Sequence, residues 1–303
     1  FRIVTNKYLK LIKELEKLNR HHISPDMDLT NEKLKEFYKG NIEKYDDDPS
    51  LTWRIPPGYK VIRAELKDSK GNLICSHKDN PMHLWSYSPS FKGKVKYSDL
   101  KKKILFDPQR PYAIVFHFRN QYRFWKREWG FSLNIQQYQK LKKNESYLVD
   151  IKTEFYQDSL KQFLLKKPSN KNNVILVSHI DHYCQVNDGL ASSVLNNEVV
   201  EDLSEKLNNI NICSLNSIEI IGSVYFLKKY KLNFSNTIAA ISTNGLSLES
   251  DLIFQKSGKM GSIINKVINL THLIYYPKNK MTEFREIWGK DEIAYEVPGI
   301  QIP

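Results

Sequence analysis

The sequence predicts an α/β protein, with a doubly wound, mostly parallel sheet and an inserted β-rich domain. Three features of the 303 residues support this class. Apolar residues recur at helical spacing near the N-terminus, short strands with turn signals fill the middle, and strands then alternate with helices. We therefore expect N-terminal helices over 1–50 that belong to the α/β domain, a β-rich insert over 51–168, and the α/β domain proper over 169–303.

Two helices are expected in the first 50 residues. The first spans 6–20, where tyrosine, leucine and isoleucine recur on one face. Residues 28–32 supply capping side chains before a second helix over 32–45, and the acidic run and proline at 46–49 end it. The first domain boundary is placed there.

The middle of the chain has the pattern of a β-rich domain. A strand over 59–66, a hairpin turn at 68–72 and a returning strand over 73–76 open it. A further strand is expected over 145–154, and no internal repeat is visible in this part.

A polar linker at 168–173 precedes the part in which strands and helices alternate. The strands expected there span 174–178, 217–221, 237–241 and 273–276, and the helices span 189–207, 223–230 and 263–268. The run at 174–178 is apolar up to its last residue, as in a parallel strand buried on both faces. The alternation predicts the doubly wound sheet.

Composition limits the class of protein and its surroundings. A chain that is 41% hydrophobic and 26% charged is typical of a globular fold, and no apolar run approaches the length of a membrane-spanning helix. The net charge of +12 would suit nucleic acid or an anionic membrane, but the lysines are scattered among Asn, Asp and Glu. We expect neither partner, and a homo-oligomer stays open. Three widely spaced cysteines, Cys75, Cys184 and Cys213, favour a reducing compartment and a cytoplasmic location.

Polar residues gather where three of the predicted strands end. His179 and Asp181 follow the first strand, and Asp188 lies near the start of the next helix. The second strand carries Glu219, and the third runs into Ser-Thr-Asn-Gly at 242–245. Because the carboxyl ends of parallel strands meet at one edge of a sheet, these groups are expected close together. A carboxylate in an apolar run is costly to bury unless it meets a metal or a hydrogen-bond partner.

These residue types suit a zinc hydrolase, which needs imidazole and carboxylate ligands and a carboxylate base. His179 and Asp188 are the candidate ligands, and Glu219 is the candidate base. Asp181 is expected to orient the His179 imidazole. The alternative is a polar loop at the sheet edge whose groups satisfy one another without a metal.

Three motifs resemble the co-catalytic zinc aminopeptidases of metallopeptidase clan MH: His179-Ile-Asp181, Asn187-Asp188 and Glu219-Ile-Ile-Gly-Ser223. In that clan a His-x-Asp and a later Asp bind metal, and a Glu before a Gly…Ser turn acts as general base. The resemblance therefore implies a zinc-exopeptidase-like fold and a peptide or amide substrate.

A closer resemblance is to a bacterial branch of aminopeptidase-like proteins, formerly classed as a domain of unknown function. That branch has a β-rich domain ahead of the metal motif, and its motifs are similar to His-x-x-His-Pro…Asn-Asp and Glu-Thr-Ile-Gly-Ser. Further signatures of the branch are Asn80-Pro-Met-His-Leu-Trp-Ser-Tyr-Ser88, Tyr122…Trp129-Gly-Phe131 and Asp291-Glu292…Tyr295…Pro298-Gly299.

The chain departs from the family pattern at several places. Tyr183 stands where the branch has Pro, and Ile220 stands where the clan has a second Glu, which favours one zinc ion over two. The third strand runs into 243–245 without the expected ligand Asp, so Asp291 or Glu292 is expected to supply that carboxylate. The late ligand His does not occur before Pro303, so the α/β domain is expected to be C-terminally incomplete. No role is assigned to His182.

The function expected from the motifs and the resemblance is a zinc-dependent aminopeptidase-like hydrolase that cleaves a peptide or amide bond. One alternative keeps the fold and acts on an amide or amino-modified sugar, or only binds its ligand. A nucleic-acid-binding module is the other alternative, and it rests on net charge alone.

Overall fold

The computed structural model describes residues 6–247, 249–286 and 291–303, and they divide into two compact units. The first unit takes its residues from Phe1–Lys17, Asp28–Ile55 and Ser159–Pro303. The second takes its residues from Leu18–Met27 and Pro56–Asp158. Most of the predicted β-rich insert, 51–168, falls in the second unit.

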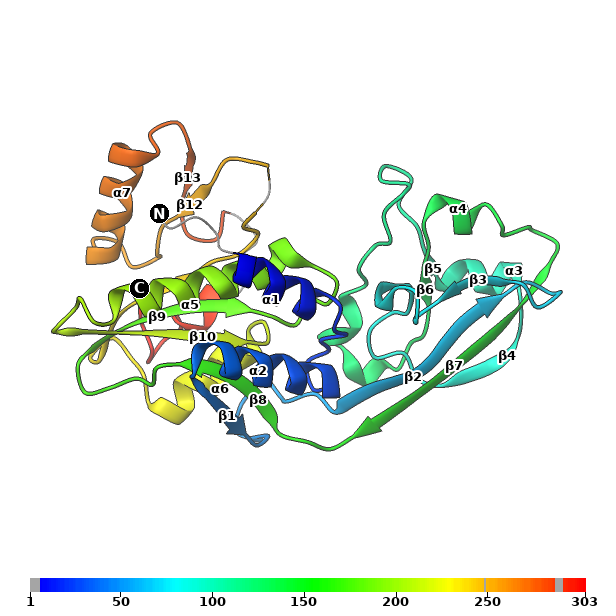
Figure 1. The fold of residues 1–303 in the computed structure, drawn as a ribbon, viewed down its shortest axis with the longest axis horizontal. Coiled ribbons are helices and arrows are strands. Elements are labelled where there is room, and N and C mark those ends of the chain that lie inside the picture. Colours follow the sequence, from blue (N-terminus) through cyan, green and yellow to red (C-terminus); the bar gives the residue numbers. More distant parts are fainter. Residues whose placement is uncertain (1–5, 248, 287–290) are drawn as a thin grey trace. The chain divides into compact units, whose positions relative to one another are not determined.

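A five-stranded sheet is the centre of the first unit (Figure 1). Its strands, in spatial order, are β1 (Asn41–Tyr45), β8 (Leu160–Leu165), β10 (Ile210–Ser217), β9 (Asn172–His179) and β11 (Thr237–Ser242). β9 pairs in parallel with both β10 and β11, whereas β8 is antiparallel to both β1 and β10. The predicted α/β class is confirmed, with a mixed sheet whose three C-terminal strands are parallel.

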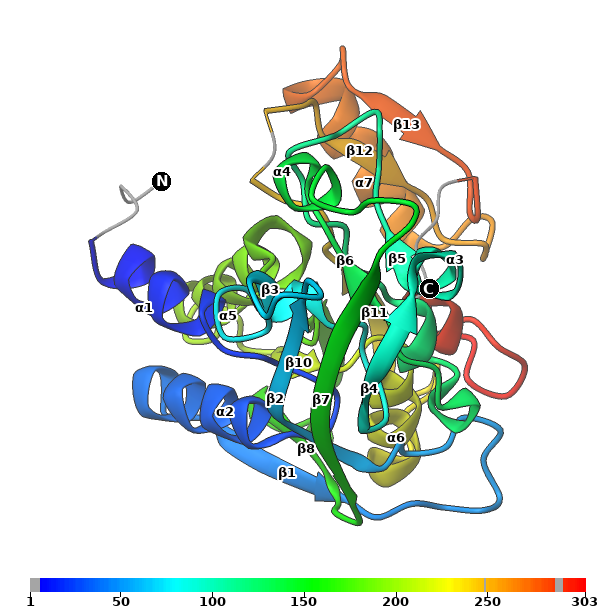
Figure 2. The same cartoon turned by 90° about the vertical axis from the view of Figure 1, so that its right-hand side faces the viewer.

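The connections of β9, β10 and β11 place the two helices between them on opposite faces of the sheet. The chain passes from β9 through α5 (Ala191–Leu203) to β10 on one side, then through α6 (Ile221–Tyr230) to β11 on the other side of β9. Right-handed crossovers in opposite directions put their helices on opposite faces. Figure 2 shows α5 and α6 on the two sides of the sheet. In such sheets, ligands bind at the carboxyl end of the strand where the direction reverses, which here is β9.

The core of this unit explains why 174–178 is apolar. Ile175 and Val177 on β9 are fully buried and pack in one cluster with Leu215 of β10 and Phe226 of α6. A parallel strand covered by helices on both faces needs apolar side chains at successive positions. The predicted strand over 174–178 is therefore confirmed as the buried part of β9.

The predicted helix over 32–45 is wrong in its second half. The helix is α2 (Pro25–Tyr38), which ends at Lys39, a residue in the left-handed region (φ 57°) whose N–H donates to the Lys35 carbonyl. Residues 41–45 form β1 instead, paired with β8 in the register Tyr45 to Leu160. Pairing at the sheet edge outweighs the helical propensity of these residues.

Two further predicted strands are wrong. β10 ends at Ser217, so Glu219 lies in the turn before α6 and not inside a strand. The segment predicted as a strand over 273–276 is the end of α7 (Ile263–Tyr275). A short apolar run alone does not distinguish a strand from a helix. Over the longer segment, apolar residues recur at helical spacing, at Ile263, Val267, Leu270 and Ile274.

The remaining elements of the first unit are α1 (Asn6–Glu16), a π-helical turn at Val186–Leu190, the parallel pair β12 (Ile253–Gln255) and β13 (Lys280–Thr282), and the 3₁₀ turn η6 (Asp291–Ala294).

The second unit has an antiparallel sheet in the order β3 (Leu73–Ser76), β2 (Gly58–Lys67), β7 (Ser146–Tyr156) and β4 (Phe91–Lys96). It also contains the pair β5 (Ile104–Leu105) and β6 (Phe131–Ser132) and the short helices α3 (Tyr97–Leu100) and α4 (Ile135–Tyr138). Ala64, Leu66, Tyr147 and Val149 lie in the core of this sheet.

None of the helices among the described residues has both the length and the apolar character needed to cross a membrane. Cys75, Cys184 and Cys213 are all free thiols.

The second unit buries histidines in their neutral form. Burial, with smaller contributions from neighbouring histidines, lowers the pKa of His77 to about 4 and that of His21 well below its usual value. The side-chain amide of Asn19 lies 3.0 Å from His77 Nε2, with Nδ2 as the donor. Protonation at Nε2 would place two donors face to face.

We predict that this unit loses stability as the pH falls from 6.5 to 4. The unfolded chain takes up the His77 proton near 6.5, whereas the folded chain takes it up near 4. The stabilisation is fully present above 6.5, and roughly 3 kcal/mol of unfolding free energy is lost across that window. Chemical denaturation at pH 7 and at pH 4.5 measures the loss. His77→Gln, which keeps an acceptor for Asn19, should lose less, and an equal loss in both proteins would refute the prediction.

Candidate metal centre

The carboxyl end of β9 carries His179, the last residue of that strand. His179 lies opposite Ser217 of β10, and the N–H of Ile180 donates to the Ser217 carbonyl at 2.8 Å. His179 is 4% exposed. Backbone pairing and burial together fix where its imidazole lies, at the edge of the sheet where the chain direction reverses.

Asp188 reaches the same place through a tight turn before α5. The turn departs from helical geometry at Asp188 (φ −98°, ψ 76°) and Gly189 (φ 125°, ψ −65°). A Cβ atom on Gly189 would lie 2.3 Å from the His179 carbonyl oxygen. Glycine is therefore required for the turn to lie against the end of β9. The turn brings the Asp188 carboxylate next to His179.

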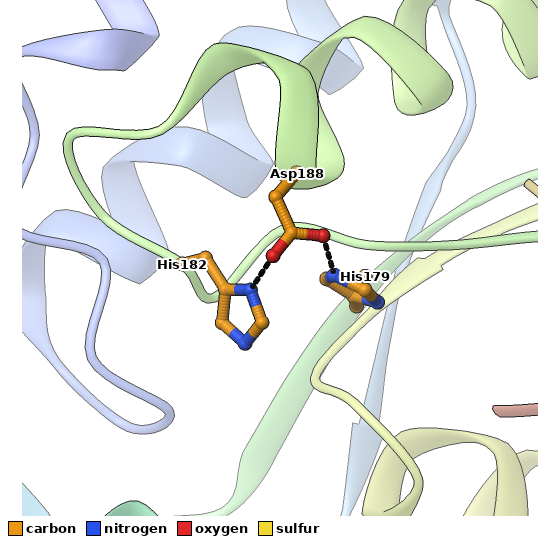
Figure 3. A group of neighbouring side chains, drawn as sticks. All are labelled: His179, His182 and Asp188. Atoms are coloured by element: carbon orange, nitrogen blue, oxygen red, sulfur yellow. Dashed lines mark hydrogen bonds and ion pairs between the residues drawn. The ribbon is translucent and has the colours of Figure 1, made fainter. Parts of the chain in front are cut away.

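Figure 3 shows the resulting cluster of His179, His182 and Asp188. Asp188 Oδ1 lies 3.0 Å from His179 Nε2, and Asp188 Oδ2 lies 2.8 Å from His182 Nδ1. The three atoms that would bind a metal lie within 4.8 Å of one another. Two imidazoles and a carboxylate are a donor set found in catalytic zinc sites.

His182 is the member of the cluster that sequence reasoning left without a role. It lies in the loop between β9 and the Asp188 turn, and its ring stands 4.6 Å from that of His179, measured between ring centroids. A signal was present in the sequence, because His179 and His182 form the His-x-x-His spacing of the branch that the chain resembles. The direction of the ring depends on a turn that spacing does not reveal.

Charge in the cluster follows from burial and from the partners of each group. Burial alone would lower the pKa of His179, but its hydrogen bonds with Asp188 and Asp291 outweigh burial and raise that pKa well above its usual value. Burial would raise the pKa of Asp188, yet the two imidazoles hold it far below its usual value. The Asp188 side chain is 36% exposed, against 4% for His179. Solvent therefore reaches the cluster at Asp188.

Glu219 lies in the turn between β10 and α6, with one carboxylate oxygen 3.7 Å from His182 Nε2. Its backbone N–H donates to Asp181 Oδ1 at 3.1 Å. The N–H of Ile221 donates to the Glu219 carbonyl at 2.6 Å, and Ile220 between them has φ 60° and ψ −62°. These values define a γ-turn of the strained type with positive φ, which is rare for a β-branched residue.

Asp291 lies on the other side of the His179 imidazole from Asp188. Its Oδ2 is 2.9 Å from His179 Nδ1, and its Oδ1 accepts the N–H of Ile220 at 2.8 Å. Asp291 is 1% exposed. The sequence suggested Asp291 as a metal ligand and Asp181 as the residue that orients His179. In the structure Asp291 contacts the imidazole at Nδ1, and Asp181 holds the Glu219 turn.

Glu292, the remaining predicted site residue, and Thr243 contact other groups. Glu292 accepts a hydrogen bond from Gln255 at 3.1 Å, and burial raises its pKa. Thr243, where the family pattern has a ligand Asp, donates its hydroxyl to Asn196 at 3.1 Å. The structure therefore brings together His179, Asp188, Glu219 and Asp291, with Asp181 holding the Glu219 turn.

The donor set fits a zinc ion. His179 Nε2 and His182 Nδ1 both face the same carboxylate, and His179 Nδ1 is occupied by Asp291. A metal-binding histidine commonly donates its second ring nitrogen to a carboxylate, which leaves the first nitrogen for the metal. Three protein ligands and an accessible side are also the usual composition of a catalytic zinc site.

Comparison with known proteins gives a family match in the β-rich part of the chain. Residues 58–154 match the family described as "Domain of unknown function (DUF2172)". A candidate polysaccharide biosynthesis protein with an aminopeptidase-like domain, from Clostridium acetobutylicum, is 23% identical over 258 residues, which are 83% of this chain and 57% of that protein. The chain therefore spans little more than half the length of this curated relative.

Solved structures agree on the fold. A candidate peptidase from Clostridium acetobutylicum superposes with a TM-score of 0.88 at 20% identity, over 98% of this chain and 69% of that one. A zinc aminopeptidase from Bacillus subtilis superposes with a TM-score of 0.61 at 11% identity, over 99% of this chain and 85% of that one. The aminopeptidase from Aneurinibacillus sp. strain AM-1 gives a TM-score of 0.52 at 13% identity, over 98% and 82%. The chain has an aminopeptidase-like fold.

We predict that Gly189→Ala destabilises the first unit and disrupts the cluster. The added Cβ would meet the His179 carbonyl, so the backbone at the end of β9 must shift. The alanine at 189 would also bear the strain of a positive φ. The matched control is Gly71→Ala, also at positive φ (90°) but with no atom within 4 Å of the new Cβ. Strain alone should cost about 1–3 kcal/mol in either variant, and the clash should add roughly 1–3 kcal/mol at 189. Equal losses in denaturation would contradict the assigned role of Gly189.

Proposed function

We propose that the protein is a zinc-dependent, aminopeptidase-like hydrolase that cleaves a peptide or amide bond. The observation that carries the proposal is the cluster of His179, His182 and Asp188 at the carboxyl end of β9, with the Glu219 carboxylate 3.7 Å from His182. The aminopeptidase-like fold supports it. The expected cytoplasmic location belongs to the same proposal.

His179 through Nε2, His182 through Nδ1 and Asp188 would hold one zinc ion. Bound zinc would polarise the scissile carbonyl and lower the pKa of water in its open position. Asp188 would contribute the negative charge that partly balances the metal. Ile220 offers no carboxylate where the clan has a second Glu, which supports one ion over two.

Glu219 would act as the general base and would then pass the proton to the leaving amine. Its side chain is 15% exposed, which leaves the carboxylate reachable from the cluster but shielded from bulk water. Asp181 accepts a hydrogen bond from the Glu219 N–H, and this bond fixes the Cα position from which the Glu219 carboxylate extends. A base held in this way needs little reorganisation when the substrate arrives.

We expect about one zinc ion per purified chain, measured by elemental analysis under non-chelating conditions. His182→Ala and Asp188→Ala should each lose that zinc, because each removes a ligand from a three-residue set. The matched control is His272→Ala on α7, whose ring nitrogen contacts the Asn279 carbonyl away from the cluster. A chain without zinc, or a zinc content that falls equally in all three variants, would rule out this metal site.

We expect Glu219→Gln to lower hydrolysis of aminoacyl amides by about 10²–10⁴-fold, since glutamine has no basic oxygen for the proton. The zinc content should stay unchanged. Glu283→Gln is the control, because Glu283 pairs with Lys256 at the surface and its side chain is 64% exposed. If hydrolysis survives Glu219→Gln at the level of the control, Glu219 is not the base.

A second candidate is hydrolysis of an amide on an amino-modified sugar. The name of the Clostridium acetobutylicum relative, which combines polysaccharide biosynthesis with an aminopeptidase-like domain, favours this substrate class. Parallel assays with aminoacyl amides and N-acylated amino sugars distinguish the two. A zinc-loaded protein that binds but cleaves neither would be a catalytically silent relative.

A further inference from the structure

Asp291 uses both of its carboxylate oxygens on groups of the site. Oδ2 contacts His179 Nδ1 at 2.9 Å, and Oδ1 accepts the Ile220 N–H at 2.8 Å. The residue is 1% exposed, so water does not compete for these oxygens. A carboxylate on Nδ1 also lies on the opposite side of the ring from Nε2, the nitrogen that faces Asp188.

From this geometry we infer that Asp291 is a positioning residue that ties the imidazole of His179 to the strained turn carrying Glu219. The inference deepens the proposed function and rests on it. One carboxylate would thus set the relative positions of the metal ligand and the general base. Neither the resemblance nor the spacing of the sequence predicts this link.

The first effect of Asp291 is on the His179 ring. A carboxylate accepts hydrogen bonds and donates none, so the nitrogen facing it carries the proton. Nε2 faces Asp188 and carries a proton as well in the metal-free site. When a metal displaces that proton, the proton held at Nδ1 leaves the lone pair of Nε2 for the metal. The contact also prevents the ring from rotating about its Cβ–Cγ bond.

The second effect is on the turn at 219–221. Ile220 is the N-cap residue of α6, and its side chain makes no capping hydrogen bond to the helix. The buried Asp291 oxygen accepts the N–H of Ile220. A negative charge at a helix N-terminus is also favourable. The hydrogen bond therefore offsets part of the strain of a γ-turn with positive φ at an isoleucine.

Two carboxylates hold consecutive N–H groups of this turn. Asp181 Oδ1 accepts from Glu219 at 3.1 Å, and Asp291 Oδ1 accepts from Ile220. Asp291 also contacts His179, with its Oδ2 2.9 Å from Nδ1. The segment that carries Asp291 is in turn held against α6, since the Tyr295 hydroxyl lies 3.3 Å from Ser223 Oγ. Asp181 and Asp291 are therefore a matched pair for experiment.

The test compares Asp291→Asn with Asp181→Asn by two measurements. The first is proton exchange at His179 Nδ1 and at the Ile220 amide, followed by NMR in labelled, metal-free protein. The second is zinc affinity by competition with a chromophoric chelator. An asparagine has one acceptor oxygen for two donors, so Asp291→Asn should speed exchange at one or both protons by at least roughly 10-fold, and weaken zinc roughly 10- to 100-fold. Asp181→Asn should leave the His179 Nδ1 proton unchanged.

Three outcomes would overturn the inference. Exchange at His179 Nδ1 that responds to Asp181→Asn and not to Asp291→Asn would assign the orienting role to Asp181. Complete loss of zinc stoichiometry in Asp291→Asn, as in Asp188→Ala, would make Asp291 a ligand. Unchanged exchange and affinity would leave it without a positioning role.

A poorly folded Asp291→Asn protein does not end the test. Asp291→Asn is then made in an Ile220→Gly background, which lacks the side chain that makes φ 60° costly. Both measurements are repeated there, with Ile220→Gly alone as the reference. If wild-type protein binds no zinc, the proposed function fails, while the exchange measurement still decides the role of Asp291. Where a cleaved amide is known, Asp291→Asn should lower kcat more than it raises KM.

Discussion

The imidazole of His179 lies between two carboxylates, and the rest of the site depends on that arrangement. Asp188 contacts one ring nitrogen and Asp291 the other, at 3.0 and 2.9 Å. A buried imidazole whose two ring nitrogens both make hydrogen bonds is fixed in position and in protonation. Each of the two carboxylates also contacts a second part of the site. Asp188 brings in His182, and Asp291 brings in the turn of Glu219. Residues that lie far apart in the sequence thereby form one site.

The sheet provides the place where this arrangement can form. β9 is paired in parallel on both sides and covered by helices, so its carboxyl end is a fixed point from which His179 extends. The turn at Gly189 comes close enough to the strand end that a single methyl group would not fit. Backbone geometry therefore brings the charged groups together. Once together, the hydrogen bonds among these groups offset the cost of burying them at this edge.

The sequence alone predicted the α/β class and the buried strand over 174–178, because alternating elements and an apolar run are local patterns. His179, Asp188 and Glu219 could be proposed from where predicted elements end and from the motifs. Asp291 was suggested as a ligand and His182 stood at His-x-x-His spacing, but the contacts of both depend on what local pattern does not contain: a turn with an unusual backbone, and a hydrogen bond across 112 positions. The strand at 41–45 was missed for the same reason, since its conformation is decided by pairing with β8.

The conformation of Ile220 limits how this site can change. Ile220 stands where the clan that the sequence resembles has a second glutamate, and it is 7% exposed and occupies the centre of a γ-turn. Replacing Ile220 by Glu would bury a charge beside Asp291 rather than simply add a ligand. A path to a second metal would therefore require the turn, its hydrogen bond to Asp291 and the start of α6 to change together. Mutation at a single codon does not achieve that, so the turn itself would restrict the proposed centre to a single ion.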